Sequence, residues 1–153
     1  MPQGLTACLV PLGPDMWHEF ALGLEFSDPH ATIDLLLAAD AITSHPQCDR
    51  ATAALILAKA AAAGFHRGEA PAAYDGAAAR AFANRLTELM VTGTYASARF
   101  ALPPLALRLV IRQLGPHGPL TLPPLSLGHS PHRPRYGFSA WHPVQACPQA
   151  RSA

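Results

Sequence analysis

A histidine, a cysteine and an aspartate lie close together in the stretch SHPQCDRATAALILAKAAAAG of this 153-residue chain, and they are the residue types best suited to chemistry. Cys48 follows His45 by three residues, at the start of a long apolar run. A cysteine at the start of a helix, with a histidine nearby, is typical of hydrolases and redox enzymes that use a thiolate nucleophile. A small cysteine-dependent enzyme that uses Cys48 with a histidine is therefore one hypothesis.

The residues beside Cys48 favour a structural role instead. The carboxylate of Asp49 opposes formation of a thiolate next to it, and cysteine is commonly a small buried apolar residue. Asp49 is well placed as the N-cap of a helix, because it can accept from the free N–H group of Ala51 or Thr52. Arg50 would then lie in the first turn and pair with an acid on a neighbouring helix. The triplet is predicted to begin a helix, and no catalytic residue is assigned.

Other groups of polar residues are less organised. Four residues near the C-terminus are of the kinds that bind zinc: His129, His132, His142 and Cys147. They lie in a proline-rich stretch and form no second closely spaced pair, so we predict neither a metal nor a cofactor. Asp15 and Glu19 share a helix face and are expected to be solvated. The chain has no Gly-rich phosphate loop, GxSxG, HExxH or CxxC motif.

Charge is sparse and almost balanced. Only 14% of the residues are charged, against roughly 25% in ordinary domains, and the net charge is +1. This excludes a general attraction to nucleic acid or acidic membranes. From Gly115 onward, however, there are three arginines and no acid. Ten of the eleven basic residues are arginine, which together with abundant alanine and proline indicates a GC-rich bacterial gene.

The cysteine count and the N-terminus predict the compartment. The chain has three widely spaced cysteines, and its first residues lack the basic region of a signal peptide. Both features favour a reducing compartment, so a cytoplasmic protein is expected. The longest nearly uncharged apolar stretch, residues 51–65, is shorter than the roughly 20 residues that a membrane span needs. We expect no membrane partner.

Turn residues and apolar spacing predict four helices in the first two-thirds of the chain. The first runs from Asp15 to Leu22, and the second begins at Ser27 or Asp28 and stops before Pro46. Four residues are expected to form the buried face of the second helix: Ile33, Leu36, Leu37 and Ala41.

The third helix starts after Asp49 and ends at Gly64, and the fourth runs from Asp75 to just before Gly93. Apolar residues surround the third helix on all sides, so it should be central and buried.

The C-terminal third is punctuated by proline. Residues 94–102 could form a short strand, and the stretch PPLALRLVIRQLG favours a fifth helix, with a strand as the serious rival. The fold class is therefore mainly α, a compact bundle of four or five helices with a proline-rich, extended C-terminal segment. We expect a single domain over residues 1–153, with a helical body at 1–114 and a tail at 115–153 that packs on it.

Arginines alternate with aromatic residues in the tail sequence HRPRYGFSAWHP. Arg133, Arg135, Tyr136 and Trp141 are the predicted partner-binding residues, since arginine and aromatic side chains are common anchors of protein interfaces. Two alternatives stay open. The aromatic side chains could anchor the tail to the core, or they could stack on bases.

A resemblance adds to this interpretation. His45, Pro46, Cys48, Asp49 and Thr52-Ala53 match the pattern HPxCDxxTA, which resembles the core motif of a small bacterial family of unknown function. The match extends at most from Asp15 to about Tyr95, and the chain has AKAAAAG where similar sequences often have an aromatic residue. Members of such families occur near toxin–immunity genes, which implies inhibition by binding.

Together these features predict a non-enzymatic bacterial binding protein, of the immunity type that inhibits a partner toxin. Its motif residues are His45, Cys48, Asp49, Arg50 and Thr52, and its partner is another protein. The cysteine-dependent enzyme remains the alternative.

Overall fold

Helices account for most of the chain in the computed structural model, which describes residues 4–28, 33–69 and 74–131. The α-helices of these residues are α1 (Leu5–Leu9), α2 (Pro14–Gly23), α3 (Ile33–Thr43), α4 (Arg50–Ala62), α5 (Gly76–Val91) and α6 (Pro104–Leu114). Two short 3₁₀ helices, η1 (Val10–Leu12) and η2 (Phe65–Arg67), and two short strands, β1 (Phe100–Ala101) and β2 (Ser130–Pro131), complete the elements. The prediction of a mainly α bundle is confirmed.

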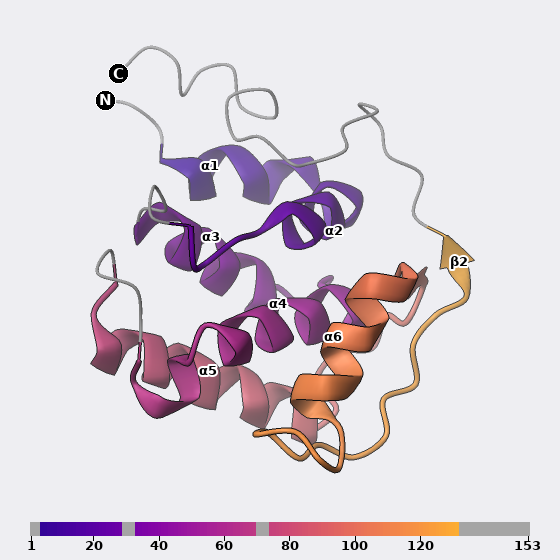
Figure 1. Ribbon diagram of the computed structural model, residues 1–153. Coiled ribbons are helices and arrows are strands. Elements are labelled where there is room, and N and C mark those ends of the chain that lie inside the picture. The colour runs from indigo at the N-terminus through magenta and orange to yellow at the C-terminus, as the bar shows by residue number, and fades with distance from the viewer. Residues whose placement is uncertain (1–3, 29–32, 70–73, 132–153) are drawn as a thin grey trace.

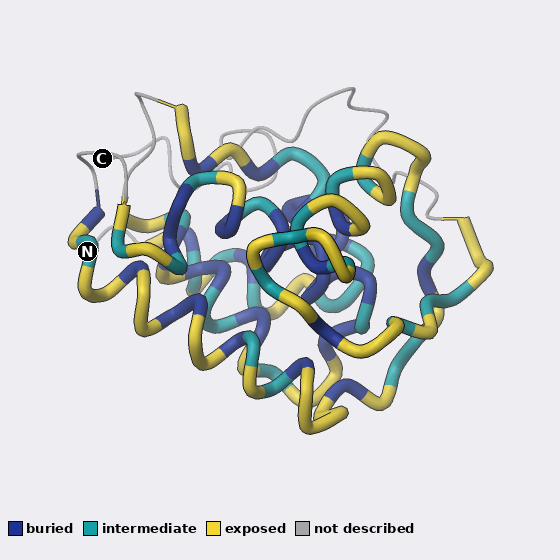
Figure 2. Tube along the Cα trace, turned by 60° about the horizontal axis from the view of Figure 1, so that its bottom comes forward, coloured by how far each residue is buried: buried dark blue, intermediate teal, exposed yellow. Residues whose placement is uncertain are grey.

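α4 occupies the centre of the bundle (Figure 1). It packs against α2, α3, α5 and α6, and ten of its thirteen residues are buried (Figure 2). Its many alanines leave room for neighbouring helices to approach closely. Gly64 ends the helix in the left-handed conformation at φ 84°, which a residue with a side chain rarely adopts. The predicted central helix and its ends are therefore confirmed.

The other predicted helices agree in position with those observed. α2 covers the predicted Asp15–Leu22 helix, and α5 begins at its N-cap Asp75, whose carboxylate accepts from the Ala77 N–H. Residues 104–114 form a helix, α6, so the rival strand is wrong there. The predicted second helix begins at Ser27 or Asp28, and its residues 29–32 lie outside the described residues.

The buried face of α3 differs from the prediction. Ile33 and Leu37 are 43% and 52% exposed, whereas Leu36, Ala39 and Ile42 are buried. The face that meets α1, α4 and α5 is centred on Ala39. Ala38 and Ala39 on that face allow the helices to approach closely beside the buried side chains of Leu36 and Ile42, and Ile33 and Leu37 are left on the outside.

α1 was not predicted, because Pro11 and Gly13 interrupt the apolar run at the N-terminus. The chain nevertheless forms one helical turn before these residues and then turns into α2. The indole N–H of Trp17 donates to the Leu9 carbonyl at 2.9 Å, so α2 supports the end of α1. Both residues belong to the core.

After α6 the chain turns over residues 115–120 and then runs without helix to β2. The Leu122 side chain is buried in the core, and its N–H donates to the Leu114 carbonyl. β2 then pairs in parallel with β1, Phe100 opposite Ser130. A Cβ atom on Gly128 would clash with the backbone of Ala98, so the two segments approach closely. The tail from His132 onward lies outside the described residues.

Candidate functional site

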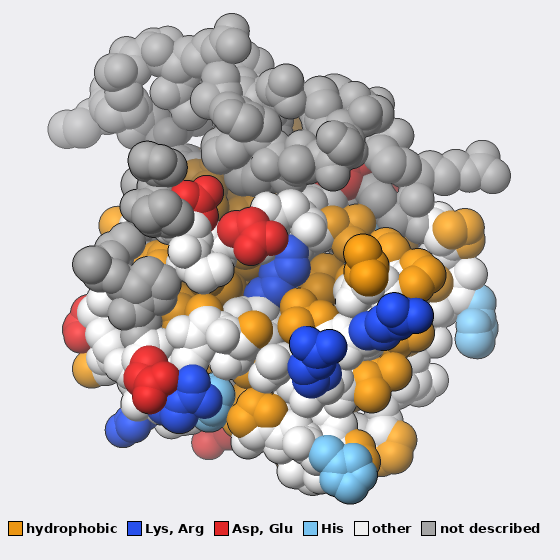
Figure 3. Space-filling model, in the orientation of Figure 1, with side chains coloured by type: hydrophobic (Ala, Val, Ile, Leu, Met, Phe, Trp, Pro, Cys, Tyr) orange, Lys and Arg blue, Asp and Glu red, His pale blue; other side chains and the backbone are white. Residues whose placement is uncertain are grey.

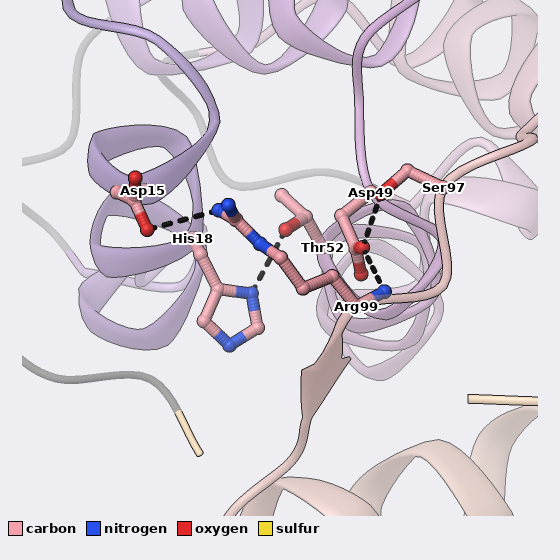
Figure 4. Close-up of polar contacts among 6 residues, drawn as sticks. All are labelled: Asp15, His18, Asp49, Thr52, Ser97 and Arg99. Atoms are coloured by element: carbon pink, nitrogen blue, oxygen red, sulfur yellow. Dashed lines mark hydrogen bonds and ion pairs between the residues drawn. The ribbon is translucent and has the colours of Figure 1, made fainter. Parts of the chain in front are cut away.

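The carboxylate of Asp49 is the centre of a group of hydrogen bonds between α2, α4 and the segment before β1 (Figure 4). One oxygen accepts from the Ala51 N–H at 2.9 Å, the N-cap bond that the sequence predicts. The other oxygen accepts from the Ser97 hydroxyl at 2.8 Å and from the Arg99 N–H at 2.7 Å. Asp49 is only 1% exposed; its bond to Ala51 is buried, and its bonds to Ser97 and Arg99 are part-buried. It therefore caps α4 and also fixes a segment fifty residues away.

Arg50 joins two further segments to the same end of α4. Its guanidinium donates to the Tyr95 carbonyl at 2.9 Å and to the Ser126 carbonyl at 2.8 Å. Its own N–H donates to the Ser97 carbonyl. The predicted pairing of Arg50 with an acid is therefore wrong. Its guanidinium donates instead to two backbone carbonyls, one before α6 in the sequence and one after it.

His18 of α2 completes this arrangement from the other side. Its Nδ1 atom lies 2.8 Å from the Thr52 hydroxyl, and its ring stacks on Phe100 of β1 with the ring centroids 4.5 Å apart. His18 is fully buried. The Thr52 hydroxyl of the motif thus positions a histidine that joins α2 to β1. We call the six residues of Figure 4 the Asp49 network: Asp15, His18, Asp49, Thr52, Ser97 and Arg99.

Asp15 and Arg99 close the network at its exposed edge. The guanidinium of Arg99 lies 3.0 Å from the Asp15 carboxylate and over the ring of Phe100, 4.3 Å from its centroid. Asp15 is half-buried and Glu19, on the same face, is buried. The expectation that these two acids form a solvated surface is therefore wrong, because this face of α2 turns toward β1 and the body.

Cys48 lies immediately before the network and is fully buried. Burial, together with the nearby Asp49 charge, raises the pKa of the Cys48 thiol to about 12. Its sulfur atom is 3.6 Å from the Asp49 carbonyl oxygen, to which it donates. At neutral pH this environment keeps the thiol protonated, the opposite of what a nucleophilic cysteine needs.

His45, the histidine that lies three residues before Cys48, makes its contacts away from the thiol. Its ring lies against Trp17, with the centroids 4.7 Å apart, and its Nδ1 atom accepts from the Gln47 N–H at 3.2 Å. The residue therefore closes the turn between α3 and α4 and covers the indole. The Cys48 N–H donates to the His45 carbonyl, so these two residues are joined through the backbone.

Several predicted residues fall outside the described part of the chain. These are the partner-binding residues Arg133, Arg135, Tyr136 and Trp141 and the zinc-binding types His132, His142 and Cys147. Within residues 4–28, 33–69 and 74–131, no three histidines, cysteines or acids are grouped as a metal would require. No helix in these ranges is long and apolar enough to cross a membrane.

Lys59, the chain's one lysine, has a role that the sequence did not reveal. Its ammonium group donates to the carbonyls of Leu22 and Leu24, each at 2.8 Å, where α2 ends. Burial lowers the pKa of Lys59 from its ordinary value. A positive charge at the C-terminal end of a helix is favourable, so Lys59, in the last turn of α4, caps α2.

A shallow groove opens at the start of α5, and its charged side chains are already engaged. It is lined by Arg67, Gly68, Asp75, Gly76, Ala77, Arg80, Ala81 and Asn84. Arg67 pairs with Glu69, and Arg80 donates to the Arg67 carbonyl. The carboxylate of Asp75 already occupies the helix N-terminus. The groove therefore does not present a binding site for an anion.

The outer surface of α6 is the second candidate site. Leu105, Leu107 and Ile111 are 78%, 38% and 60% exposed, and Arg108 and Arg112 are exposed between them. Val110 and Leu114, on the opposite side of the helix, are buried against the body. We call the five exposed residues the α6 face.

The comparisons with known proteins identify no relative. The resemblance of the HPQCDRATA stretch to a family of unknown function therefore stays a prediction. No family model matches the chain, and no curated protein or solved structure matches it.

Proposed function

We propose that the protein is a non-enzymatic binding protein whose partner is another protein. The observation that carries the proposal is the use of the motif residues. The side chains of Asp49, Arg50 and Thr52 are hydrogen-bonded to other residues of the chain, and Cys48 is buried as a protonated thiol. A motif used in this way builds a rigid body rather than a reaction centre.

The exposed apolar and arginine side chains of the α6 face support the same proposal. Large apolar side chains on an exposed helix are unfavourable in water, and a group of them commonly marks a site of protein contact. On α6 they stand together with arginines, the charged residue that is most enriched at protein interfaces.

For the finer function we propose an immunity-type protein that neutralises a bacterial toxin by binding it. The support is the resemblance of the residues 45–53 motif to families found near toxin–immunity genes. The partner would then be encoded close to this gene, and its toxicity in cells would disappear when the two are produced together.

The experiment is co-purification of the full chain, carrying a small affinity tag, from its native host. The expected result is one stoichiometric protein partner that survives a reciprocal purification with the tag on the partner. A chain that purifies without any stoichiometric protein, under several growth conditions, would contradict the binding function. A partner whose production alone does not harm cells would contradict only the immunity-type assignment.

A further inference from the structure

The residues of the α6 face are arranged as an interface rather than as a solvated helix surface. Leu107 and Ile111 are four residues apart, as are Arg108 and Arg112, so each pair lies on one side of the helix. The arginines lie between Leu105 on one flank and the Leu107–Ile111 pair on the other. Figure 3 shows two basic side chains set among apolar ones over α6.

The two arginines of this face differ from every other arginine that the structure describes. Five arginines have partners within the protein: Arg50, Arg67, Arg80, Arg85 and Arg99. Arg108 and Arg112 have no hydrogen bond or ion pair with any of the described residues. Within the part of the chain that the structure describes, no partner therefore occupies their guanidinium groups.

The surrounding sequence offers these arginines no acid. The last acidic residue of the chain is Glu88, and every charged residue after it is an arginine. α6 packs mainly on α4, whose charged residues are Arg50 and Lys59. Neither α4 nor the sequence after Glu88 therefore supplies an acid that would neutralise the positive charge of the α6 face. This favours a negatively charged partner.

We propose that the α6 face binds an acidic, amphipathic segment of a partner protein. Leu105, Leu107 and Ile111 would insert between apolar side chains of the partner, while Arg108 and Arg112 pair with its aspartates or glutamates. Such a segment needs acids spaced three or four residues apart on a helix to meet arginines with that spacing. This inference rests on the proposed function and adds the location and chemistry of the contact.

A protein segment fits this face better than an anionic lipid surface does. Recognition of anionic lipids generally uses clusters of about 4–8 basic residues, and this face has two. The arginines also lie between the apolar side chains, so the leucines could not enter a bilayer without carrying the guanidinium groups with them.

The test measures binding of a synthetic probe to the full chain. The probe is a fluorescent helical peptide of about 18 residues with glutamates four residues apart along the middle of one face and leucines on both flanks of them, and its counterpart has lysines in place of the glutamates. The double variant Arg108→Gln/Arg112→Gln is compared with Arg67→Gln/Arg80→Gln, which makes the same change of net charge on another surface. Leu105→Gln tests the apolar contribution at a single, very exposed position.

The glutamate peptide should bind the wild-type chain and should bind the Arg108/Arg112 variant about ten-fold more weakly, as expected when two ion pairs are lost. Added salt should weaken binding, the lysine peptide should bind poorly, and the Arg67/Arg80 variant should behave as wild type. Equal binding of both peptides, or an unaffected Arg108/Arg112 variant, would overturn the proposal. Stronger binding to vesicles containing phosphatidylserine than to the glutamate peptide would overturn it in favour of a lipid.

A second measurement separates this inference from the proposed function. The stoichiometric partner found by co-purification is titrated against the same variants. Weakened binding by Arg108→Gln/Arg112→Gln and by Leu105→Gln, with the control variant unchanged, is the expected result. A partner that binds all variants equally would leave the proposed function standing and refute the α6 face as its site.

Discussion

Replacing Asp49 with alanine should destabilise the protein far more than the loss of an ordinary helix cap. Loss of an N-cap costs about 0.5–2 kcal/mol. The same carboxylate also accepts from the Arg99 N–H, which would be left without its partner in a part-buried site, at a further cost of about 1.5–3 kcal/mol. The Ser97 hydroxyl can turn toward water, so its loss adds about 0.5–1 kcal/mol. The expected total is about 2.5–6 kcal/mol, a large fraction of the stability of a typical domain.

The assay is urea unfolding followed by far-UV circular dichroism, with Asp75→Ala as the matched control. Asp75 also caps a helix, but it is exposed and makes one such bond, to the Ala77 N–H at 3.1 Å. Its replacement should cost about 0.5–1 kcal/mol. A double-mutant cycle with Ser97→Ala should give a coupling of at least about 0.5 kcal/mol with Asp49. Equal losses for Asp49→Ala and Asp75→Ala, with no coupling, would refute the idea that Asp49 fixes the segment before β1.

Three further outcomes follow from burial and charge. Because of Cys48, the unfolding free energy should fall by about 1.4 kcal/mol per pH unit between pH 9 and 12. The unfolded chain releases the thiol proton near pH 9, whereas the folded chain retains it to about pH 12. Chemical denaturation at each pH should show a shallower decline of the unfolding free energy for Cys48→Ala than for the wild type. Leu55→Ala should cost about 2–5 kcal/mol by chemical denaturation, because its side chain is fully buried, whereas Leu105→Ala should change stability by less than about 0.5 kcal/mol. Lys59→Met should lower the thermal midpoint and cost about 1–3 kcal/mol, because it removes the donor for two carbonyls at the end of α2; an unchanged midpoint would show that Lys59 does not cap that helix.

Features that depend on neighbouring residues could be predicted from the sequence. The caps at Asp49 and Asp75 and the stop at Gly64 are local, because each acts within a few residues of itself. The burial of α4 also follows from its composition, since every side of the helix is apolar. These features were enough to predict a helical body with α4 at its centre.

Features that depend on distant residues could not be predicted. The exposed side of α3 is decided by which helices cover it, and the spacing of Ile33 and Leu37 carries no information about those neighbours. Lys59 meets Leu22 and Leu24 across more than thirty residues. The only sequence signal for His18 is a histidine inside an otherwise apolar helix face, which does not indicate Thr52 as its partner.

The reactivity of Cys48 tests the central claim, that the motif builds the body of the protein and is not a reaction centre. The measurement is the rate of alkylation of Cys48 by iodoacetamide in the native protein at neutral pH, followed by peptide mass spectrometry. A rise of the pKa from 9.0 to about 12 reduces the thiolate fraction about a thousand-fold, and burial excludes the reagent as well. Cys48 should therefore react only as fast as the protein unfolds, and readily in urea. Fast, saturable alkylation of Cys48 in the folded protein would contradict this account and favour the cysteine-dependent enzyme.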